Sequence, residues 1–205
     1  MKRLASFLMV PAFLVLTCGL VAAQDDPTLI RIAEDQNALE FVGQFNNTPT
    51  TSQQFGYVSS ITGLSPIFSS TTPQNETTAL FTFVTNATTN RVISNGPLRI
   101  VNRTGTTTIY LNNAPSDFSN PASFSQGTPI QVSTYRQQVI ANTLTNAFVT
   151  VHMNIITNAQ PFTLNGITYL LGQKGKSFRT TYSGQSNAPG MAPSGWFSGY
   201  AVGVK

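Results

Sequence analysis

From residue 39 onward the chain is a succession of short runs rich in β-branched and aromatic residues, separated by clusters of Asn, Gly, Pro and Ser. Runs of this kind with polar and apolar positions in alternation predict β-strands, and the clusters between them predict turns. The run at 91–102 is expected to be broken or bulged at Asn95-Gly96-Pro97. The predicted strands cover residues 39–45, 54–61, 79–85, 91–102, 106–112, 129–140, 147–156, 161–164, 167–172, 177–183 and 196–204.

Roughly nine to eleven strands in close succession, without helices between them, predict an all-β fold: an antiparallel β-barrel or a β-sandwich. The best-defined turn is Asn165-Gly166, because both residues tolerate the positive φ angles of a two-residue type I′ hairpin. The runs 161–164 and 167–172 should therefore pair as neighbours. No internal repeat and no linker divides the chain, which favours a single β-domain over residues 39–205.

Residues 1–23 have the pattern of a secretory signal peptide. Lys2 and Arg3 precede an apolar stretch, and Val21-Ala22-Ala23 supplies the small residues of a cleavage site just before Gln24. No later stretch approaches about 18 consecutive apolar residues, so no membrane span is expected in the mature protein. We therefore expect an exported bacterial protein, located in the periplasm or secreted.

Cys18 is the single cysteine, and it leaves with the signal peptide if cleavage precedes Gln24. A lipoprotein anchored through Cys18 is the minor alternative, since Thr17 and Val15 depart from the small residue and the leucine that a lipid-attachment site prefers. If cleavage removes Cys18, the mature chain of about 180 residues is cysteine-free and has to be stabilised by its core rather than by disulfides.

Residues 24–38 form the predicted N-terminal arm. Over 28–41 the residues Leu29, Ile32, Ala33 and Leu39 can share a face of a short helix, but Glu40 intrudes on that face. A short helix and an extended arm are both compatible with this pattern.

The charge of the chain is low and unevenly distributed. Five of the seven acids lie at or before residue 40, and the formal charge of +4 falls to +2 without Lys2 and Arg3. The basic residues of the β-region are scattered rather than clustered in an aromatic-rich patch, which argues against nucleic acid as a partner. Their simplest role is solvated surface charge.

His152, the only histidine, lies in the run FVTVHMNIIT at 148–157. In a strand this run divides into an apolar row of Val149, Val151, Met153 and Ile155 and a row that contains Thr150, His152 and Asn154. The apolar row is expected to face the core, so that His152 faces water. A catalytic or pH-sensing role for His152 would require that its face line a lumen.

The chain offers little acid–base chemistry. Glu76 and Asp117 are the only acids after residue 40, and both lie in predicted loops, so nothing indicates the carboxylate pair of a glycosidase. One histidine and no mature cysteine leave a zinc or copper site without ligands. The sequence thus favours a protein that is not an enzyme, with no catalytic residue, no metal and no cofactor.

Aromatic residues are the candidates for ligand binding. In the run 196–204, Trp196 and Tyr200 share one face, which is either a closing strand with Trp196 in the core or at a barrel mouth, or a platform for a carbohydrate or hydrophobic ligand. If the fold is a ligand-binding barrel, Tyr57, Tyr110 and Arg136 are expected to point into its lumen.

Two functions remain. The first is an envelope or secreted protein with a binding or structural role. The second is a small β-barrel that binds or cyclises a hydrophobic small molecule, similar in architecture to dirigent proteins and allene-oxide-cyclase barrels, which work with few ionisable groups. The comparison concerns the scaffold alone and carries over no residue role. An internal cavity would favour the second function, and a filled core the first. Oligomers are compatible with both.

Overall fold

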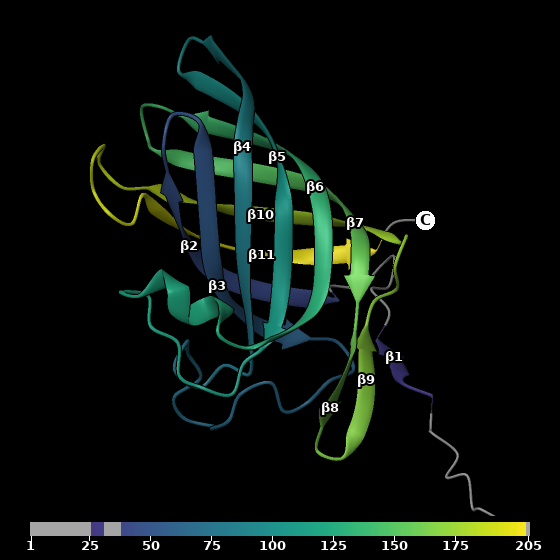
Figure 1. Ribbon diagram of the computed structural model, residues 1–205. Helices are drawn as coiled ribbons and strands as arrows, with labels where there is room; N and C mark the ends of the chain where they lie inside the picture. The colour runs from purple at the N-terminus through teal and green to yellow at the C-terminus, as the bar shows by residue number, and fades with distance from the viewer. Residues whose placement is uncertain (1–25, 31–37, 204–205) are drawn as a thin grey trace, which may run out of the picture.

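Eight antiparallel strands close into a barrel, in the order β10-β11-β2-β3-β4-β5-β6-β7 (Figure 1). The computed structural model describes residues 26–30 and 38–203. This closure confirms the all-β prediction and selects the barrel over the sandwich. Within the described ranges, no helix has the length and apolar character needed to cross a membrane. The barrel strands are β2 (Leu39–Asn47), β3 (Thr51–Ile61), β4 (Phe81–Asn95), β5 (Leu98–Leu111), β6 (Thr128–Asn142), β7 (Ala147–Ala159), β10 (Ser177–Ser186) and β11 (Gly195–Gly203).

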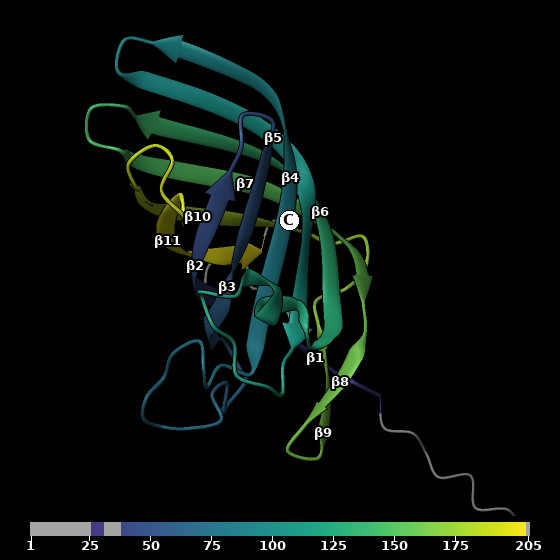
Figure 2. The same ribbon diagram turned by 60° about the vertical axis from the view of Figure 1, so that its left-hand side comes forward.

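The β4–β5 hairpin is the longest in the barrel. The predicted break at Asn95-Gly96-Pro97 is confirmed: the run 91–102 is the tip of this hairpin, which turns at Gly96 with a φ of +56°. Its chain then continues without a break through residues 103–105 to Leu111. Figure 2 shows that the β4–β5 and β6–β7 hairpins project beyond the other strands at the same end of the barrel.

A three-stranded sheet lies beside the opposite end, in the order β1 (Thr28–Ile30), β9 (Ile167–Leu171), β8 (Pro161–Leu164). Strands β8 and β9 pair through the predicted turn, where Asn165 and Gly166 have φ angles of 51° and 79°. Residues 28–30 are extended and pair in parallel with β9. The other residues of the predicted arm or helix, at 31–37, and the signal peptide lie outside the described residues.

The half of the barrel next to the small sheet, at the bottom of Figure 1, has a filled apolar core, and we call it the lower half. Phe41, Phe83 and Phe197 pack edge to face or tilted inside it, and Phe162 of the small sheet packs on Phe81 at 5.6 Å between ring centroids. Leu64, Leu171 and Ile30 belong to the same cluster, so the loop after β3 and the small sheet close this end. The barrel is therefore filled at one end, and any ligand has to enter from the other.

Inward-facing glycines make room for the interior rings. A Cβ at Gly105 would lie 2.6 Å from the Tyr135 hydroxyl oxygen, and a Cβ at Gly43 would lie 2.7 Å from the Phe197 ring. Each glycine on one strand thus accommodates an aromatic side chain of another strand. This pairing of small and large residues is how a narrow barrel holds so many rings.

Strand β7 faces the opposite way from the prediction. Val149, Val151, Met153 and Ile155 lie on the outer wall with exposed fractions of 37–53%. Thr150, His152 and Asn154 point into the barrel, where they are 1–4% exposed. The predicted alternation is correct, but the assignment of its two faces is wrong. The physical reason is that the inward polar groups of His152 and Asn154 find hydrogen-bond partners on other strands, so burying them is not prohibitive.

Candidate functional site at the open end of the barrel

The interior of the barrel opens at the end where the long hairpins project. There a cavity of about 520 Å³, which we call the mouth cavity, is lined by residues of β2 to β7, β10 and the loop after β10. Phe45, Val101, Val139 and Phe148 give it apolar walls, and Arg99, Arg103, Gln137 and Thr150 give it polar ones. A second cavity deeper in the barrel has a volume of only about 50 Å³. Of these two, the mouth cavity alone has the size of a small-molecule site.

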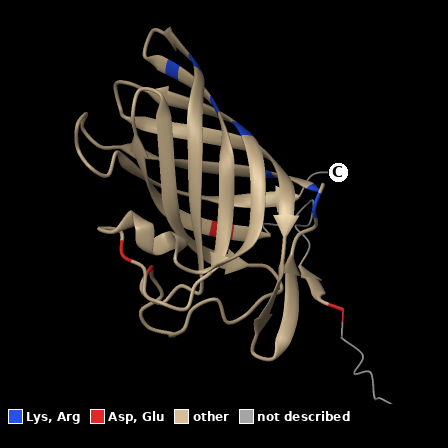
Figure 3. Ribbon diagram, viewed as in Figure 1, with Lys and Arg blue, Asp and Glu red and all other residues tan. Residues whose placement is uncertain are grey.

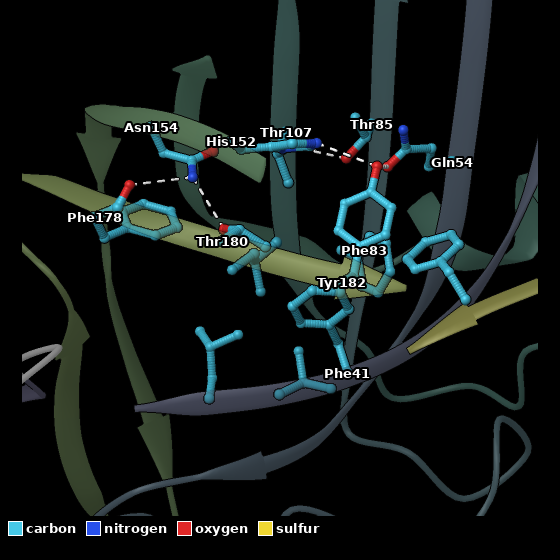
Figure 4. Close-up of a pocket in the computed structure, with 14 residues that line it drawn as sticks. Phe41, Gln54, Phe83, Thr85, Thr107, His152, Asn154, Phe178, Thr180 and Tyr182 are labelled. Carbon is cyan, nitrogen blue, oxygen red and sulfur yellow. Dashed lines mark hydrogen bonds between the residues drawn. The ribbon is translucent and has the colours of Figure 1, made fainter. Parts of the chain in front are cut away.

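Tyr182, Gln54 and Gln137 form the floor of the mouth cavity, and His152 lines the smaller cavity behind them. The Tyr182 hydroxyl donates to Gln54 Oε1 at 3.0 Å and accepts from Gln137 Nε2 at 2.6 Å. His152 Nε2 lies 3.2 Å from the same oxygen. We call these four residues the Tyr182 cluster; they come from β3, β6, β7 and β10. Figure 4 shows Tyr182 between Gln54 and His152, with Asn154 and Thr180 farther along the same layer.

The Tyr182 cluster fixes the state of His152. Because the single Tyr182 proton goes to Gln54, His152 Nε2 has to donate to the tyrosine oxygen. Burial, aided by the positive charge of Arg103, lowers the pKa of His152 to about 3. The ring stacks on Tyr135 with centroids 4.3 Å apart and an interplanar angle of 11°. At neutral pH His152 is therefore an uncharged, hydrogen-bonded ring rather than a proton carrier.

Tyr182 and Tyr135, which contact His152, are also poor proton donors. Burial raises the pKa of Tyr182 to about 12 and raises that of Tyr135 well above its usual range. A general acid or base works best with a pKa near the operating pH. The layer is thus suited to hydrogen bonding and packing, and poorly suited to proton transfer at neutral pH.

Arg103 is the buried cation of the mouth cavity. It points inward from β5 with an exposed fraction of 8%, opposite Gln137 of β6. Arg99 lies four residues farther toward the tip of the hairpin and lines the same cavity. Figure 3 shows basic residues on the upper part of the barrel, further basic residues beside the C-terminus, and acidic residues on the lower half. The open end therefore carries positive charge.

No family model, curated protein or solved structure matches this chain. Within residues 26–30 and 38–203, no three His, Cys, Asp or Glu side chains come together as a metal site would require.

The five predicted ligand-binding residues all lie on the outer wall of the barrel. Tyr57 packs against Phe68 and Phe118, while Tyr110 packs on the cluster of Phe55, Val84 and Phe124. Arg136 pairs across the sheet with the exposed Met153. The expectation that Tyr57, Tyr110 and Arg136 point into a lumen is wrong, because the strands present their neighbouring residues inward instead.

Trp196 and Tyr200 share a face as predicted, and this face is exposed, with fractions of 46% and 41%. The alternative that Trp196 lies in the core is therefore wrong. Its indole packs on Phe118 with centroids 5.0 Å apart and lines an open groove on the outer wall together with Ile140 and Val149. A carbohydrate or hydrophobic ligand on this platform stays a prediction.

Trp196, as the only tryptophan, should report whether the loop at 112–127 is docked. Phe118 belongs to this loop, which includes the 3₁₀ helix η1 (Pro121–Ser125). Replacing Phe118 by alanine should expose the indole and shift its fluorescence emission to longer wavelengths. The matched variant Tyr200→Ala, on the same face but four residues along β11 from the indole, should leave the emission unchanged. Equal spectra for wild type and Phe118→Ala would contradict this docking.

Sequence reasoning missed Arg103, Tyr135 and Tyr182. Arg103 lies in the segment Asn102-Arg103-Thr104-Gly105, which resembles a turn but is the middle of β5. One signal was available: Val101, Arg103 and Gly105 alternate along this segment, and a glycine in step with an apolar residue marks the crowded inner face of a barrel.

Proposed function

We propose that this protein binds a small amphipathic organic molecule in the mouth cavity. The observation that carries the proposal is the cavity itself: about 520 Å³ at one end of a barrel whose other end is filled. Small-molecule sites typically have about 300–1,000 Å³, mostly apolar walls and a few converging polar groups. Phe45, Val101 and Phe148 supply the apolar walls, and Arg103 with Gln54, Gln137 and Tyr182 supplies the polar groups.

The proposal is binding rather than cyclisation. Catalysis of ring closure would ask the site to move a proton or stabilise developing charge at neutral pH. The high pKa of Tyr182, with the neutral His152 hydrogen-bonded behind it, makes the floor of the cavity a weak participant in proton transfer. Export belongs to the proposal as well, and its support is the sequence of residues 1–23. A mature protein beginning at Gln24, seen by intact mass, would support it.

Binding can be tested with the neutral fluorescent probe N-phenyl-1-naphthylamine. Saturable fluorescence enhancement is expected with the purified protein. Ala141→Trp should weaken this binding roughly tenfold or more, because Ala141 is half-buried and lines the cavity, so that an indole at this position would occupy the space of the probe.

Ile140→Trp is the matched control. Ile140 is the preceding residue of β6, points to the outer wall and is 42% exposed. The Ile140→Trp variant adds the same indole without filling the cavity, so its affinity for the probe should equal that of wild type. Absence of saturable binding to wild type, or an equal loss in both variants, would refute the mouth cavity as the site and favour a structural role.

A further inference from the structure

Arg103 has no negative partner in the described chain. The charged or titratable groups that interact with it are Tyr182, Tyr135, His152 and Arg99, and none of these is a carboxylate. Its only hydrogen bond runs from Nε to Thr89 Oγ1 at 3.3 Å, within the part of the chain that the structure describes. The terminal guanidinium nitrogens are thus left without a protein acceptor there.

Such an arrangement is costly unless something else supplies the missing charge. A buried cation that lacks a counter-ion loses hydration without gaining an attraction. Arg99 adds a second positive charge on the same wall of the cavity and increases the cost, since the two residues repel each other. Burial and this repulsion both lower the pKa of Arg103, although an arginine remains protonated. The free protein therefore holds a site prepared for a negative charge.

The surroundings of Arg103 favour an anion attached to an apolar body. Val101 and Val139 lie on the inner wall next to it, one step nearer the open end on β5 and β6. Phe148 closes the wall on β7. A planar guanidinium matches the two oxygens of a carboxylate in a bidentate pair. The cavity therefore combines one matched charge with a hydrocarbon wall.

We infer that the molecule bound in the mouth cavity is an amphipathic organic acid whose carboxylate pairs with Arg103, its hydrocarbon part lying against Val101, Val139 and Phe148. The inference rests on the proposed function and specifies its ligand class. Arg99, nearer the entrance, attracts the anion toward the cavity, and Arg103 holds it. Glu76 lies in the loop between β3 and β4, Asp117 lies in the loop between β5 and β6, and neither is among the groups that act on Arg103.

The experiment compares decanoate with decanol, which share a chain and differ in head group. Each displaces N-phenyl-1-naphthylamine from the purified protein, and the half-displacing concentrations are compared. Decanoate should displace the probe from wild type at a concentration roughly tenfold or more below that of decanol, because a charge-assisted pair with a buried guanidinium is stronger than a neutral hydrogen bond. Decyltrimethylammonium should displace it least.

Arg103→Met keeps a similar volume and removes the charge, so the barrel is expected to fold. In this variant the preference for decanoate over decanol should fall to about onefold, while the neutral probe still binds. Arg136→Gln, on the outer wall, should retain the wild-type preference. The comparison of decanoate with decanol on wild type needs no variant, and it remains decisive if Arg103→Met fails to fold.

Equal displacement by decanoate and decanol from wild type would overturn the inference and leave the proposed function standing, since the neutral probe would still be bound. A decanoate preference that persists in Arg103→Met would overturn the assignment to Arg103. If wild type binds neither the neutral probe nor decanoate, the proposed function is refuted, and the inference with it.

Discussion

Replacing Phe41 by alanine is expected to lower the free energy of unfolding by about 3–5 kcal/mol. The Phe41 ring lies in the filled half of the barrel, with its centroid 5.7 Å from that of Phe83 and 6.1 Å from those of Tyr182 and Phe197. Its removal loses both the transfer free energy of the ring and the contacts around the space it leaves. The rings around it come from β4, β10 and β11, so the loss weakens several strands together. Urea denaturation followed by circular dichroism measures the change.

Val149→Ala is the control from the other side of the wall. Val149 is as apolar as a core residue but is 50% exposed on the outer face of β7. Its truncation should change the free energy of unfolding by about 0.5 kcal/mol or less. A loss comparable to that of Phe41→Ala would show that the outer row of β7 is covered and would contradict its assignment to the exposed face.

Local signals in the sequence predict the elements of this fold well. The β8–β9 turn could be predicted from Asn165-Gly166, because the turn geometry requires the positive φ angles that these residues adopt. The strands at 129–140 and 147–156 follow from their own alternation and lie within β6 and β7. Closure into a barrel follows from pairing between β7 and β10, and that pairing depends on residues distant in the sequence.

The face that each strand turns inward could not be read from the strand itself. Hydrophobicity alone places Val149 and Val151 in the core and His152 outside. In the barrel, His152 is buried because Tyr182 accepts its hydrogen bond and Tyr135 stacks on its ring. These partners lie on β10 and β6, so the stabilising contacts of His152 are visible only in three dimensions. The same inversion moves the candidate site from Tyr57, Tyr110 and Arg136 to Tyr135, Tyr182 and Arg103.

The two halves of the interior divide the tasks of stability and recognition. Aromatic rings and the small sheet fill the lower half, and their burial stabilises the fold. The upper half keeps an open cavity with a buried cation, an arrangement that contributes little to stability by itself. The Tyr182 cluster lies between them. Residues that break the usual rules of burial are expected at functional sites, and they gather at this level of the barrel.

His152 makes the stability of the barrel depend on pH. The folded state keeps this ring neutral down to a pH of about 3, whereas the unfolded chain protonates it near its ordinary pKa of about 6.5. The unfolded state therefore binds more protons between these values, and the free energy of unfolding falls as the pH falls through this window. The slope approaches about 1.4 kcal/mol per pH unit below the unfolded pKa, and the contribution is fully present above it.

His152→Gln isolates this contribution, because glutamine has an amide donor for Tyr182 but cannot be protonated in this range. Between about pH 6 and about pH 4, wild type should lose about 2–3 kcal/mol more unfolding free energy than the variant, as measured by urea denaturation at each pH. The carboxylates titrate alike in both proteins, so the difference between the two slopes belongs to His152 even if the variant is less stable at every pH. Parallel profiles would mean that the folded barrel accepts a proton on His152 as readily as the unfolded chain does. That result would contradict the burial of an uncharged ring beside Arg103, on which the chemistry assigned to the floor of the mouth cavity depends.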